Sequence, residues 1–473
     1  MKIARLVHPG FWFGKSSMEE ALQLAKRGVG GFCLYGGTRQ EIAHFTQAVR
    51  QVSPLPYLLI SADYEDGLGR WVADTPLLPS NLALGAAHDP ALAFQKGFLT
   101  AIQARSLGVD WIFAPVLDLA NNPLNPIVNT RSFGQDPQLV ISLAGAFMDG
   151  LKKGGAVNSL KHFPGHGDTS TDSHLALPVL PKTYDQLNML ELKPFQALLD
   201  KADSVMIGHL FLPEIDAKFP ASLSPKIISQ TLRQQLGYTG CVITDALLMK
   251  AIGDEKQAAL HALQAGADIL LVPEDPTALI DFLQTQPIAQ EILDRSERIQ
   301  DELCSRAQQM PRSTQQEAFT PSTLNTNTAQ QALVQTGKSN PFKPGQTVAY
   351  LEIGNKNPAL SAAPFLNTLQ QAGVQLAAYP APADVLIVLC FRRYQAFQGK
   401  IALEEQEQLS LQQAAKNYTH TCAVLFSSPW ALQGVMQADT SIYTFCPAPE
   451  FQVQAAQILL GQQVARGSLP ITL

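Results

Sequence analysis

The 473-residue sequence lacks several features that would each indicate a class of protein. Only 16% of its residues are charged and no basic run occurs at a net charge of −6, which argues against a nucleic-acid-binding surface. No stretch offers about 20 uninterrupted apolar residues, so we expect no membrane span. The start, MKIARLVHPGFWFGKS, lacks the continuous apolar segment of a signal peptide. Together these absences predict a cytoplasmic protein.

Cysteine is scarce, and no Cys-x-x-Cys pair occurs. This pattern favours reduced, mostly buried thiols over a disulfide framework or a zinc ribbon. The six cysteines are scattered over the chain: Cys33, Cys241, Cys304, Cys390, Cys422 and Cys446. Apolar residues make up 46% of the sequence, which suits a well-buried α/β protein, and the length predicts two domains.

From residue 1 to about 275, short continuous apolar runs alternate with longer helix-like segments. Continuous apolarity is typical of strands buried on both faces, as in a parallel sheet. Eight such units in about 250 residues predict an N-terminal (β/α)8 TIM-type barrel over residues 1–300. A doubly wound open sheet is the alternative. The runs are 2–8, 30–36, 57–63, 111–118, 157–162, 204–209, 241–246 and 267–273.

The second part of the chain has a different character. A helix-like stretch ends near residue 309, and the Pro-, Thr- and Gln-rich sequence after it predicts a linker over residues 301–346. From residue 347, strand-like runs alternate again with helix-like segments. Residues 347–473 are therefore predicted to form a smaller C-terminal α/β sandwich with a mostly parallel sheet. The predicted fold class is α/β throughout.

Ionisable residues stand at the ends of five of the eight predicted strands. One such residue has a simple explanation as a helix cap, but capping does not readily explain five on one rim. In a barrel the active site lies at the carboxyl ends of the strands. We therefore expect a functional rim built from Asp63, Asp118, Lys161 with His162, His209 and Asp245.

The segment from Lys161 to His174 is the densest in polar chemistry. Three histidines invite a metal site, yet His162 and His166 are separated by proline and glycine and cannot form a helical ligand pair. No phosphate-binding glycine motif occurs either. We expect no metal and no cofactor, with a metal as the minor alternative. Asp172 lies two residues before His174, so its carboxylate could orient one imidazole nitrogen, although such a loop pair is most simply solvated.

A resemblance changes the weight of that pair. The sequence KHFPGHGDT followed by Asp172-Ser173-His174 resembles the signature of glycoside hydrolase family 3, in its bacterial β-N-acetylglucosaminidase branch. The resemblance continues in the family order through FAPVLD (113–118), RSFG (131–134), GCVITDAL (240–247) and GSLPITL (467–473). It covers nearly the whole chain but is weak over residues 276–460.

The resemblance implies a retaining exo-β-N-acetylglucosaminidase. Asp245 is identified as the nucleophile of a covalent glycosyl-enzyme mechanism, and His174, partnered by Asp172, as the general acid/base. The implied substrate-binding residues are Asp63, Arg70, Arg131, Lys161 and His162. Arg70 is the weakest of these assignments. The family reads D-x-E-G-G before its arginine, whereas Asp66 replaces a glycine here and the arginine comes one residue earlier.

Three alternatives stay open at this point. A glycoside phosphorylase would use phosphate in place of water, and a β-glucosidase or β-xylosidase of the same family would take its acid/base from the second domain. A non-catalytic sugar-binding barrel would have lost the nucleophile or the Asp172/His174 pair, and both are present. The expected substrate is a GlcNAc-containing glycoside, such as a cell-wall muropeptide fragment. We expect a monomer or homodimer with no nucleic-acid or membrane partner.

Overall fold

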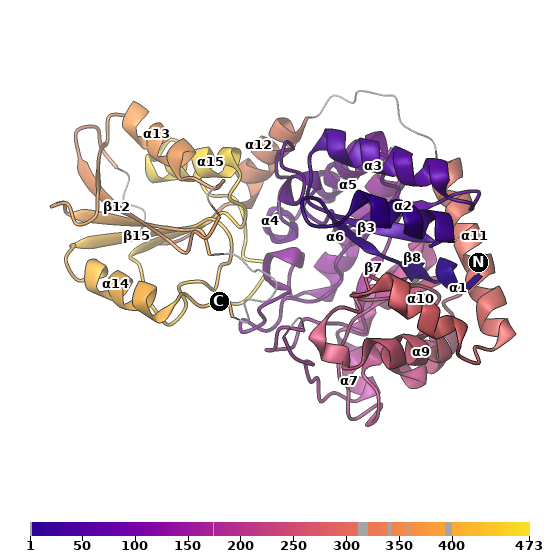
Figure 1. Ribbon diagram of the computed structural model, residues 1–473. Helices are drawn as coiled ribbons and strands as arrows, with labels where there is room; N and C mark the ends of the chain where they lie inside the picture. The colour runs from indigo at the N-terminus through magenta and orange to yellow at the C-terminus, as the bar shows by residue number, and fades with distance from the viewer. Residues whose placement is uncertain (1, 174, 311–319, 339–341, 358, 393–399) are drawn as a thin grey trace.

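The computed structural model describes all residues except 1, 174, 311–319, 339–341, 358 and 393–399. The chain forms two units: a larger N-terminal one, in which strands alternate with helices, and a smaller C-terminal one with its own sheet (Figure 1). Among the described residues, no helix is both long and apolar enough to cross a membrane.

The N-terminal strands are short and all pair in parallel. β2, which follows the first predicted run, pairs with the second run, and the pairings then join the remaining runs in chain order, while β1 of the first run pairs with the last. The ladder is split into three sheets, which isolated bridges at Val116–Lys161 and Ile243–Ile269 connect. A doubly wound sheet would not give this order. The strands are β1 (Val7–His8), β2 (Gly10–Trp12), β3 (Gly31–Tyr35), β4 (Leu59–Ala62), β5 (Trp111–Ile112), β6 (Val157–Asn158), β7 (Leu160–Phe163), β8 (Ser204–Ile207), β9 (Cys241–Thr244) and β10 (Leu270–Leu271).

Helices follow the strand runs and cover the barrel. They are α1 (Lys2–Arg5), α2 (Met18–Arg27), α3 (Arg39–Val52), α4 (Asn81–Ala87), α5 (Pro90–Ser106), α6 (Pro137–Gly154), α7 (Tyr184–Met189), α8 (Leu192–Leu198), α9 (Glu255–Ala265), α10 (Pro276–Gln284) and α11 (Gln290–Gln309), with short turns η1 (Leu68–Arg70), η2 (Asn129–Arg131), η3 (Leu199–Lys201), η4 (Ala221–Leu223) and η6 (Lys250–Ile252) and the π-helix η5 (Lys226–Gln235). Their ends carry the expected signals. In α6, for example, the Asp136 side chain caps the N-terminus before Pro137, and left-handed Gly155 ends the helix.

The first predicted strand is partly wrong, because residues 2–5 form α1. Lys2 contacts Asp294 and Glu297 of α11, and Arg5 contacts Asp301 of the same helix. These cations therefore sit against an acidic helix face. The apolar run continues as a strand only at β1.

Helices α5 and α6 pack unusually closely. A Cβ at Gly97 would lie 2.2 Å from the Phe147 carbonyl oxygen, and one at Gly150 would lie 2.2 Å from that of Phe94. Glycine is therefore needed where the two backbones meet. On this packed side α5 also carries Lys96, whose side chain is fully buried beneath the active-site face described below.

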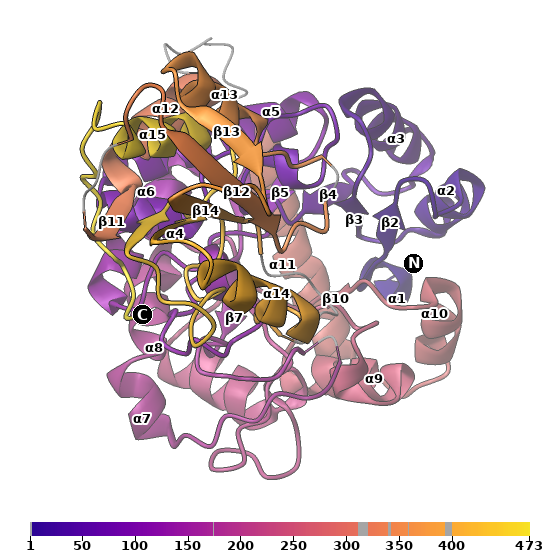
Figure 2. The same cartoon turned by 90° about the vertical axis from the view of Figure 1, so that its left-hand side faces the viewer.

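The C-terminal unit contains a six-stranded mixed sheet in the order β11-β16-β15-β14-β12-β13, parallel except for the β11–β16 pair. Helices α13 and α15 lie on one face of the sheet and α14 on the other (Figures 1 and 2). Apolar clusters fill both faces. The elements are α12 (Pro321–Ala332), β11 (Val334–Gly337), β12 (Thr347–Ile353), α13 (Ala363–Gln371), β13 (Gln375–Ala378), β14 (Val385–Cys390), α14 (Glu405–Ala415), β15 (His420–Leu425), β16 (Thr440–Tyr443) and α15 (Pro449–Leu459).

The predicted fold class, a barrel followed by a smaller α/β sandwich, is confirmed. The domain boundaries at 300, 346 and 347 stay a prediction. Within the predicted linker range, α11 runs on to Gln309, α12 packs on α4 and α15, and β11 joins the C-terminal sheet.

Candidate active site

A cleft of about 540 Å³ opens at the carboxyl ends of the barrel strands. Six of the eight predicted site residues line it: Asp63, Arg70, Arg131, Lys161, His162 and Asp245. Aromatic and apolar side chains complete the wall, among them Trp12, Tyr35, Trp71, Phe113 and Met206. Trp12 and Tyr35 are stacked with ring centroids 4.9 Å apart. The cleft therefore combines charged and polar groups with flat apolar surface, as small-molecule sites do.

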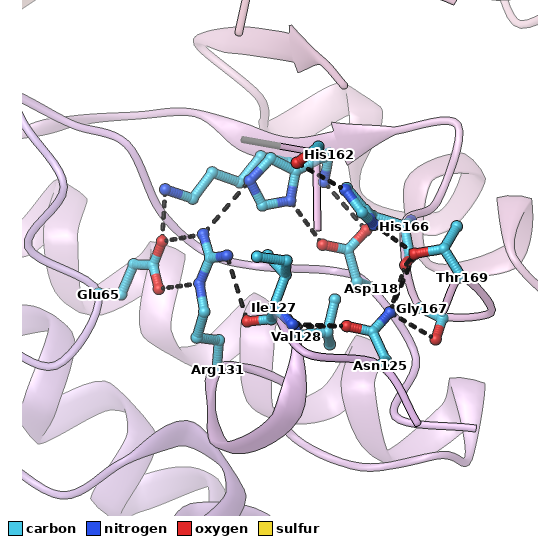
Figure 3. A network of polar contacts seen from close by, with 12 residues as sticks. Glu65, Asp118, Asn125, Ile127, Val128, Arg131, His162, His166, Gly167 and Thr169 are labelled. Atoms are coloured by element: carbon cyan, nitrogen blue, oxygen red, sulfur yellow. Dashed lines mark hydrogen bonds and ion pairs between the residues drawn. The ribbon is translucent and has the colours of Figure 1, made fainter. Parts of the chain in front are cut away.

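A cluster of alternating charges, which we call the carboxylate–cation cluster, forms one wall. The Glu65 carboxylate accepts two hydrogen bonds from the Arg131 guanidinium, at 2.8 and 2.7 Å (Figure 3). Lys161 Nζ lies 2.5 Å from Glu65 Oε1 and 2.7 Å from Asp63 Oδ1. Bidentate arginine–carboxylate pairing fixes both planes. The cluster thus holds two cations at set positions on the cleft wall.

Burial acts against the charges of Glu65, Arg131 and Lys161, and pairing overcomes it. Burial alone would raise the pKa of Glu65, yet Arg131 and Lys161 hold that pKa well below its usual value. Burial would lower the pKa of Lys161, but Asp63 and Glu65 raise it above its usual value. All three side chains therefore stay ionised around neutral pH.

A second group, the imidazole cluster, consists of Asp118, His162 and His166. His162 Nδ1 lies 2.6 Å from Asp118 Oδ2, and Asp118 Oδ1 accepts the backbone N–H groups of His162 and His166 (Figure 3). His162 Nε2 lies 3.3 Å from Arg131 Nη2. Because a guanidinium only donates, Nε2 accepts and Nδ1–H donates to Asp118. Asp118 therefore fixes the ring orientation of His162.

His166 is completely enclosed in the same cluster. Its Nδ1 lies 2.9 Å from Thr169 Oγ1, and its Nε2 lies 3.2 Å from Ser173 Oγ. Burial lowers the pKa of His166 to about 4, although the charge of Asp118 acts in the opposite direction. His166 is thus a neutral ring that supports the loop.

Asp245 follows β9 directly, as predicted. Its backbone N–H donates to the Ile207 carbonyl oxygen of β8 at 3.0 Å, and its Oδ1 accepts the Ala246 N–H at 2.8 Å. His209 lies 3.1 Å from the Ala246 carbonyl oxygen through Nε2 and 2.7 Å from Ser222 Oγ through Nδ1. The strand end and this neighbouring histidine together anchor the Asp245 backbone at the cleft.

The loop that carries Asp172 is tied down near its base. Lys182 bridges Asp168, at 2.7 Å, to the buried carboxylate of Glu191. Asp172 and Ser173 are each 1% exposed, and Ser173 lines the cleft. His174 lies outside the described residues, so the expected Asp172/His174 pair stays a prediction.

Asp66, which stands where the family pattern has a glycine, pairs with a buried lysine. Asp66 Oδ1 lies 3.2 Å from the buried Nζ of Lys96, and its Oδ2 lies 3.9 Å from Arg70 Nη1. Lys96 also donates to Asn81 Oδ1 at 2.6 Å. The charge of the Asp66 carboxylate is therefore balanced by Lys96. Arg70 still lines the cleft.

Sequence reasoning missed the central position of Glu65. It stands three residues after the end of β4 and follows Asp63 in a D-x-E pattern, which was the only available signal. The aromatic wall was also missed. Trp12 ends β2, Tyr35 ends β3 and Trp71 follows η1, and the three show no common spacing. Among the described residues, no group of three or more His, Cys, Asp or Glu side chains is arranged to hold a metal ion.

Comparison with known proteins gives this cleft its context. Residues 1–301 match the model of the glycosyl hydrolase family 3 N-terminal domain. The chain belongs to glycosyl hydrolase family 3. The resemblance seen in the sequence is thereby confirmed, as is the expectation of a glycoside hydrolase. Two relatives named β-hexosaminidase agree with the predicted branch. The protein from Nitrosospira multiformis is 35% identical over 53% of this chain and 75% of its own, and that from Stenotrophomonas maltophilia strain R551-3 is 37% identical over 50% and 72%.

Solved structures extend the likeness over the whole chain. A family 3 β-N-acetylglucosaminidase from Paenibacillus sp. FPU-7 matches with a TM-score of 0.87 and 27% identity, covering 100% of this chain and 98% of the other. A β-glucoside phosphorylase matches with a TM-score of 0.91 over 100% and 93% of the chains, at 22% identity. At that identity the second match shows the fold alone, which both of these proteins share.

Proposed function

We propose that this family 3 glycoside hydrolase is a retaining exo-β-N-acetylglucosaminidase. The observation that carries the proposal is Asp245, a carboxylate at a strand end that faces a cleft lined by Asp63, Arg131, Lys161 and His162. The likeness to proteins named β-hexosaminidase and β-N-acetylglucosaminidase supports the choice of sugar.

In the first step, an Asp245 carboxylate oxygen attacks the anomeric carbon as the bond to the leaving oxygen breaks. His174 gives that oxygen its proton, and Asp172 stabilises the imidazolium form that donates it. In the second step, His174 takes a proton from water, and the water oxygen displaces Asp245. The β configuration is therefore retained.

The remaining cleft residues hold the sugar. Arg131 and Lys161 present donors to its oxygen atoms, while Asp63 accepts from its hydroxyl groups. Because Glu65 and Asp118 fix Arg131, Lys161 and His162 before substrate arrives, little ordering is needed at the moment of reaction. Arg70 is assigned to the outer part of the cleft.

The test is turnover of a chromogenic β-N-acetylglucosaminide by the wild type, Asp245→Ala and His174→Ala, with a β-glucoside as the control substrate. We expect the wild type to release the N-acetylated sugar as its β anomer, and Asp245→Ala to lose at least about 10³-fold in kcat. Added azide should partly rescue Asp245→Ala and yield the α-glycosyl azide, because azide would attack from the side that the carboxylate vacates. Equal turnover by all three proteins would rule out this mechanism.

The acceptor is tested in the same assay. Wild-type turnover is compared with and without inorganic phosphate, and the product is identified by NMR. We expect free GlcNAc in both cases. Accumulation of the sugar 1-phosphate would show that the enzyme is a phosphorylase rather than a hydrolase. The proposed roles of Asp245 and His174 in breaking the glycosidic bond would not change.

We further propose that the natural substrates are cell-wall muropeptide fragments with a terminal GlcNAc. Muramic-acid residues carry a carboxylate, and the exposed Lys15 lies on the cleft lip beside Trp12. A muropeptide disaccharide should therefore give a higher kcat/KM than neutral chitobiose. The reverse order would assign the enzyme to chitooligosaccharides instead.

A further inference from the structure

The C-terminal unit contacts the barrel at two places close to Arg131, and the first of them is helix α4. Three residues of this helix, Leu82, Ala83 and Ala86, belong to the apolar core of the C-terminal unit rather than to that of the barrel. Asn81, the first residue of α4, donates from Nδ2 to the Arg131 carbonyl oxygen at 2.7 Å. The helix that is seated in the C-terminal core therefore also holds the Arg131 backbone.

The second attachment is a direct hydrogen bond between the two units. Asn129 Nδ2 donates to Ser428 Oγ at 3.0 Å, and both side chains are 1% exposed. Asn129 has φ +40°, in the left-handed region, and its Oδ1 accepts the Thr130 N–H at 2.9 Å. It is the first residue of η2, the turn that ends at Arg131. Ser428 lies in the loop after β15, where its Oγ also accepts the Trp430 N–H.

These contacts surround a residue whose position matters for binding. The Arg131 side chain links the carboxylate–cation cluster to His162, so a shift of the η2 backbone would disturb both clusters. We propose that the C-terminal domain positions Arg131 for substrate binding, with Ser428 as the positioning residue that acts through Asn129. The inference rests on the proposed function, in which Arg131 holds the sugar.

The physical reason lies in the burial of the Asn129–Ser428 pair. Without the Ser428 hydroxyl, the Asn129 amide would lack this acceptor in a region closed to solvent. The left-handed backbone conformation of Asn129 would then lose one of the hydrogen bonds that hold it, and η2 could rotate until the amide found another partner. A bidentate guanidinium tolerates little displacement before its geometry is lost.

The experiment measures KM and kcat separately for the full-length chain on the chromogenic β-N-acetylglucosaminide. Three variants form a cycle: Ser428→Ala, Asn129→Gly and the double variant. Glycine keeps the positive φ of residue 129 while removing its amide. Ser410→Ala is the matched control, since Ser410 is an exposed serine of the same domain, on α14.

We expect KM to rise about tenfold in Ser428→Ala, the equivalent of one buried hydrogen bond, with kcat within about threefold of the wild type. The double variant should be no worse than the more impaired single variant, because both substitutions remove the same bond. A purely structural contact would instead lower the thermal midpoint and leave KM unchanged.

Two results would overturn the inference: a KM for Ser428→Ala within about twofold of that for Ser410→Ala, or fully additive effects in the double variant. Either result would leave the proposed function intact, because both are measured against a wild type that turns over the substrate. Failure of the wild type to act on the substrate would count against the proposed function itself.

Discussion

Glu65 in the carboxylate–cation cluster and His166 in the imidazole cluster are both buried, yet only Glu65 keeps its charge. Glu65 is surrounded by cations, and its pKa falls although burial acts to raise it. His166 is bonded to the hydroxyl groups of Thr169 and Ser173, and burial lowers its pKa to about 4. The character of the nearest partners therefore decides whether a buried group keeps its charge. In the proposed function, the first cluster supplies fixed charges that bind the sugar, and in the second the neutral ring of His166 supports the loop that carries Asp172.

The largest effect is expected when the central charge of the first cluster is removed. Glu65→Gln would remove the carboxylate that pairs with both cations, Arg131 and Lys161, and would leave Lys161 paired with Asp63. We expect the free energy of unfolding to fall by about 3–5 kcal/mol and kcat/KM to fall at least about 10²-fold. Urea unfolding and steady-state kinetics measure the two effects. Glu214→Gln, at an exposed position, is the control and should change stability by less than about 0.5 kcal/mol. Equal changes in the free energy of unfolding of Glu65→Gln and Glu214→Gln would contradict the central part assigned to Glu65 in its cluster.

The sequence contained enough to predict which residues reach the cleft but not how they are paired. Asp63 and Asp245 follow buried strands directly and Lys161 lies near the end of a predicted run, so the run pattern alone places them on one rim. The Glu65–Arg131 pair joins residues 66 positions apart through two loops, and no local pattern encodes such a contact. Asp66 looked like a loss of the family pattern because its buried partner, Lys96, lies in a helix with no apparent link to the site.

The same limit applies to larger elements. The run at residues 2–8 was predicted as one strand, whereas ion pairs with α11, almost 300 residues later, accompany the helix at Lys2–Arg5. The C-terminal sheet was predicted as mostly parallel, which the structure confirms. Its antiparallel edge strand β11 lies in the segment expected to be linker, because apolar content there is low. Tertiary contacts accompany both the helix at Lys2–Arg5 and the pairing of β11 with β16.

The second prediction separates the clusters by pH. The pKa of His166 is about 4 in the folded state and about 6.5 in an unfolded chain, so the unfolded chain binds more protons between these values. Stability should therefore fall as pH drops from about 6.5 to about 4, by about 3 kcal/mol in total from this residue. Glu65, whose pKa is lowered, loses its contribution only as pH falls below its unfolded value of about 4.3.

Urea unfolding at a series of pH values tests this separation. His166→Gln retains hydrogen-bonding atoms but does not titrate, so its stability should decline less steeply than that of the wild type between pH 6.5 and 4. His44→Gln, at an exposed helix position, should follow the wild-type curve. An unchanged slope in His166→Gln would show that other groups control stability in this range.

The smallest effect is expected at Ser173, where the imidazole cluster meets the cleft. Ser173→Ala removes one neutral hydrogen bond to His166 Nε2, which should lower the free energy of unfolding by about 1 kcal/mol. Ser204 provides a matched comparison. It is also a buried serine, its hydroxyl bonds to Trp111 Nε1 and the Asn158 carbonyl oxygen, and it begins β8 at the opposite end of the barrel.

Ser204→Ala should lose at least as much stability as Ser173→Ala, because it removes two hydrogen bonds, yet only Ser173→Ala should lower kcat, by about three- to tenfold. The reason is position: Ser173 lines the cleft, follows Asp172 in the chain and ties this part of the loop to a ring that burial keeps neutral. Equal kcat values in the two variants would mean that the imidazole cluster supports the fold without guiding the loop. The carboxylate–cation cluster alone would then connect the barrel framework to catalysis.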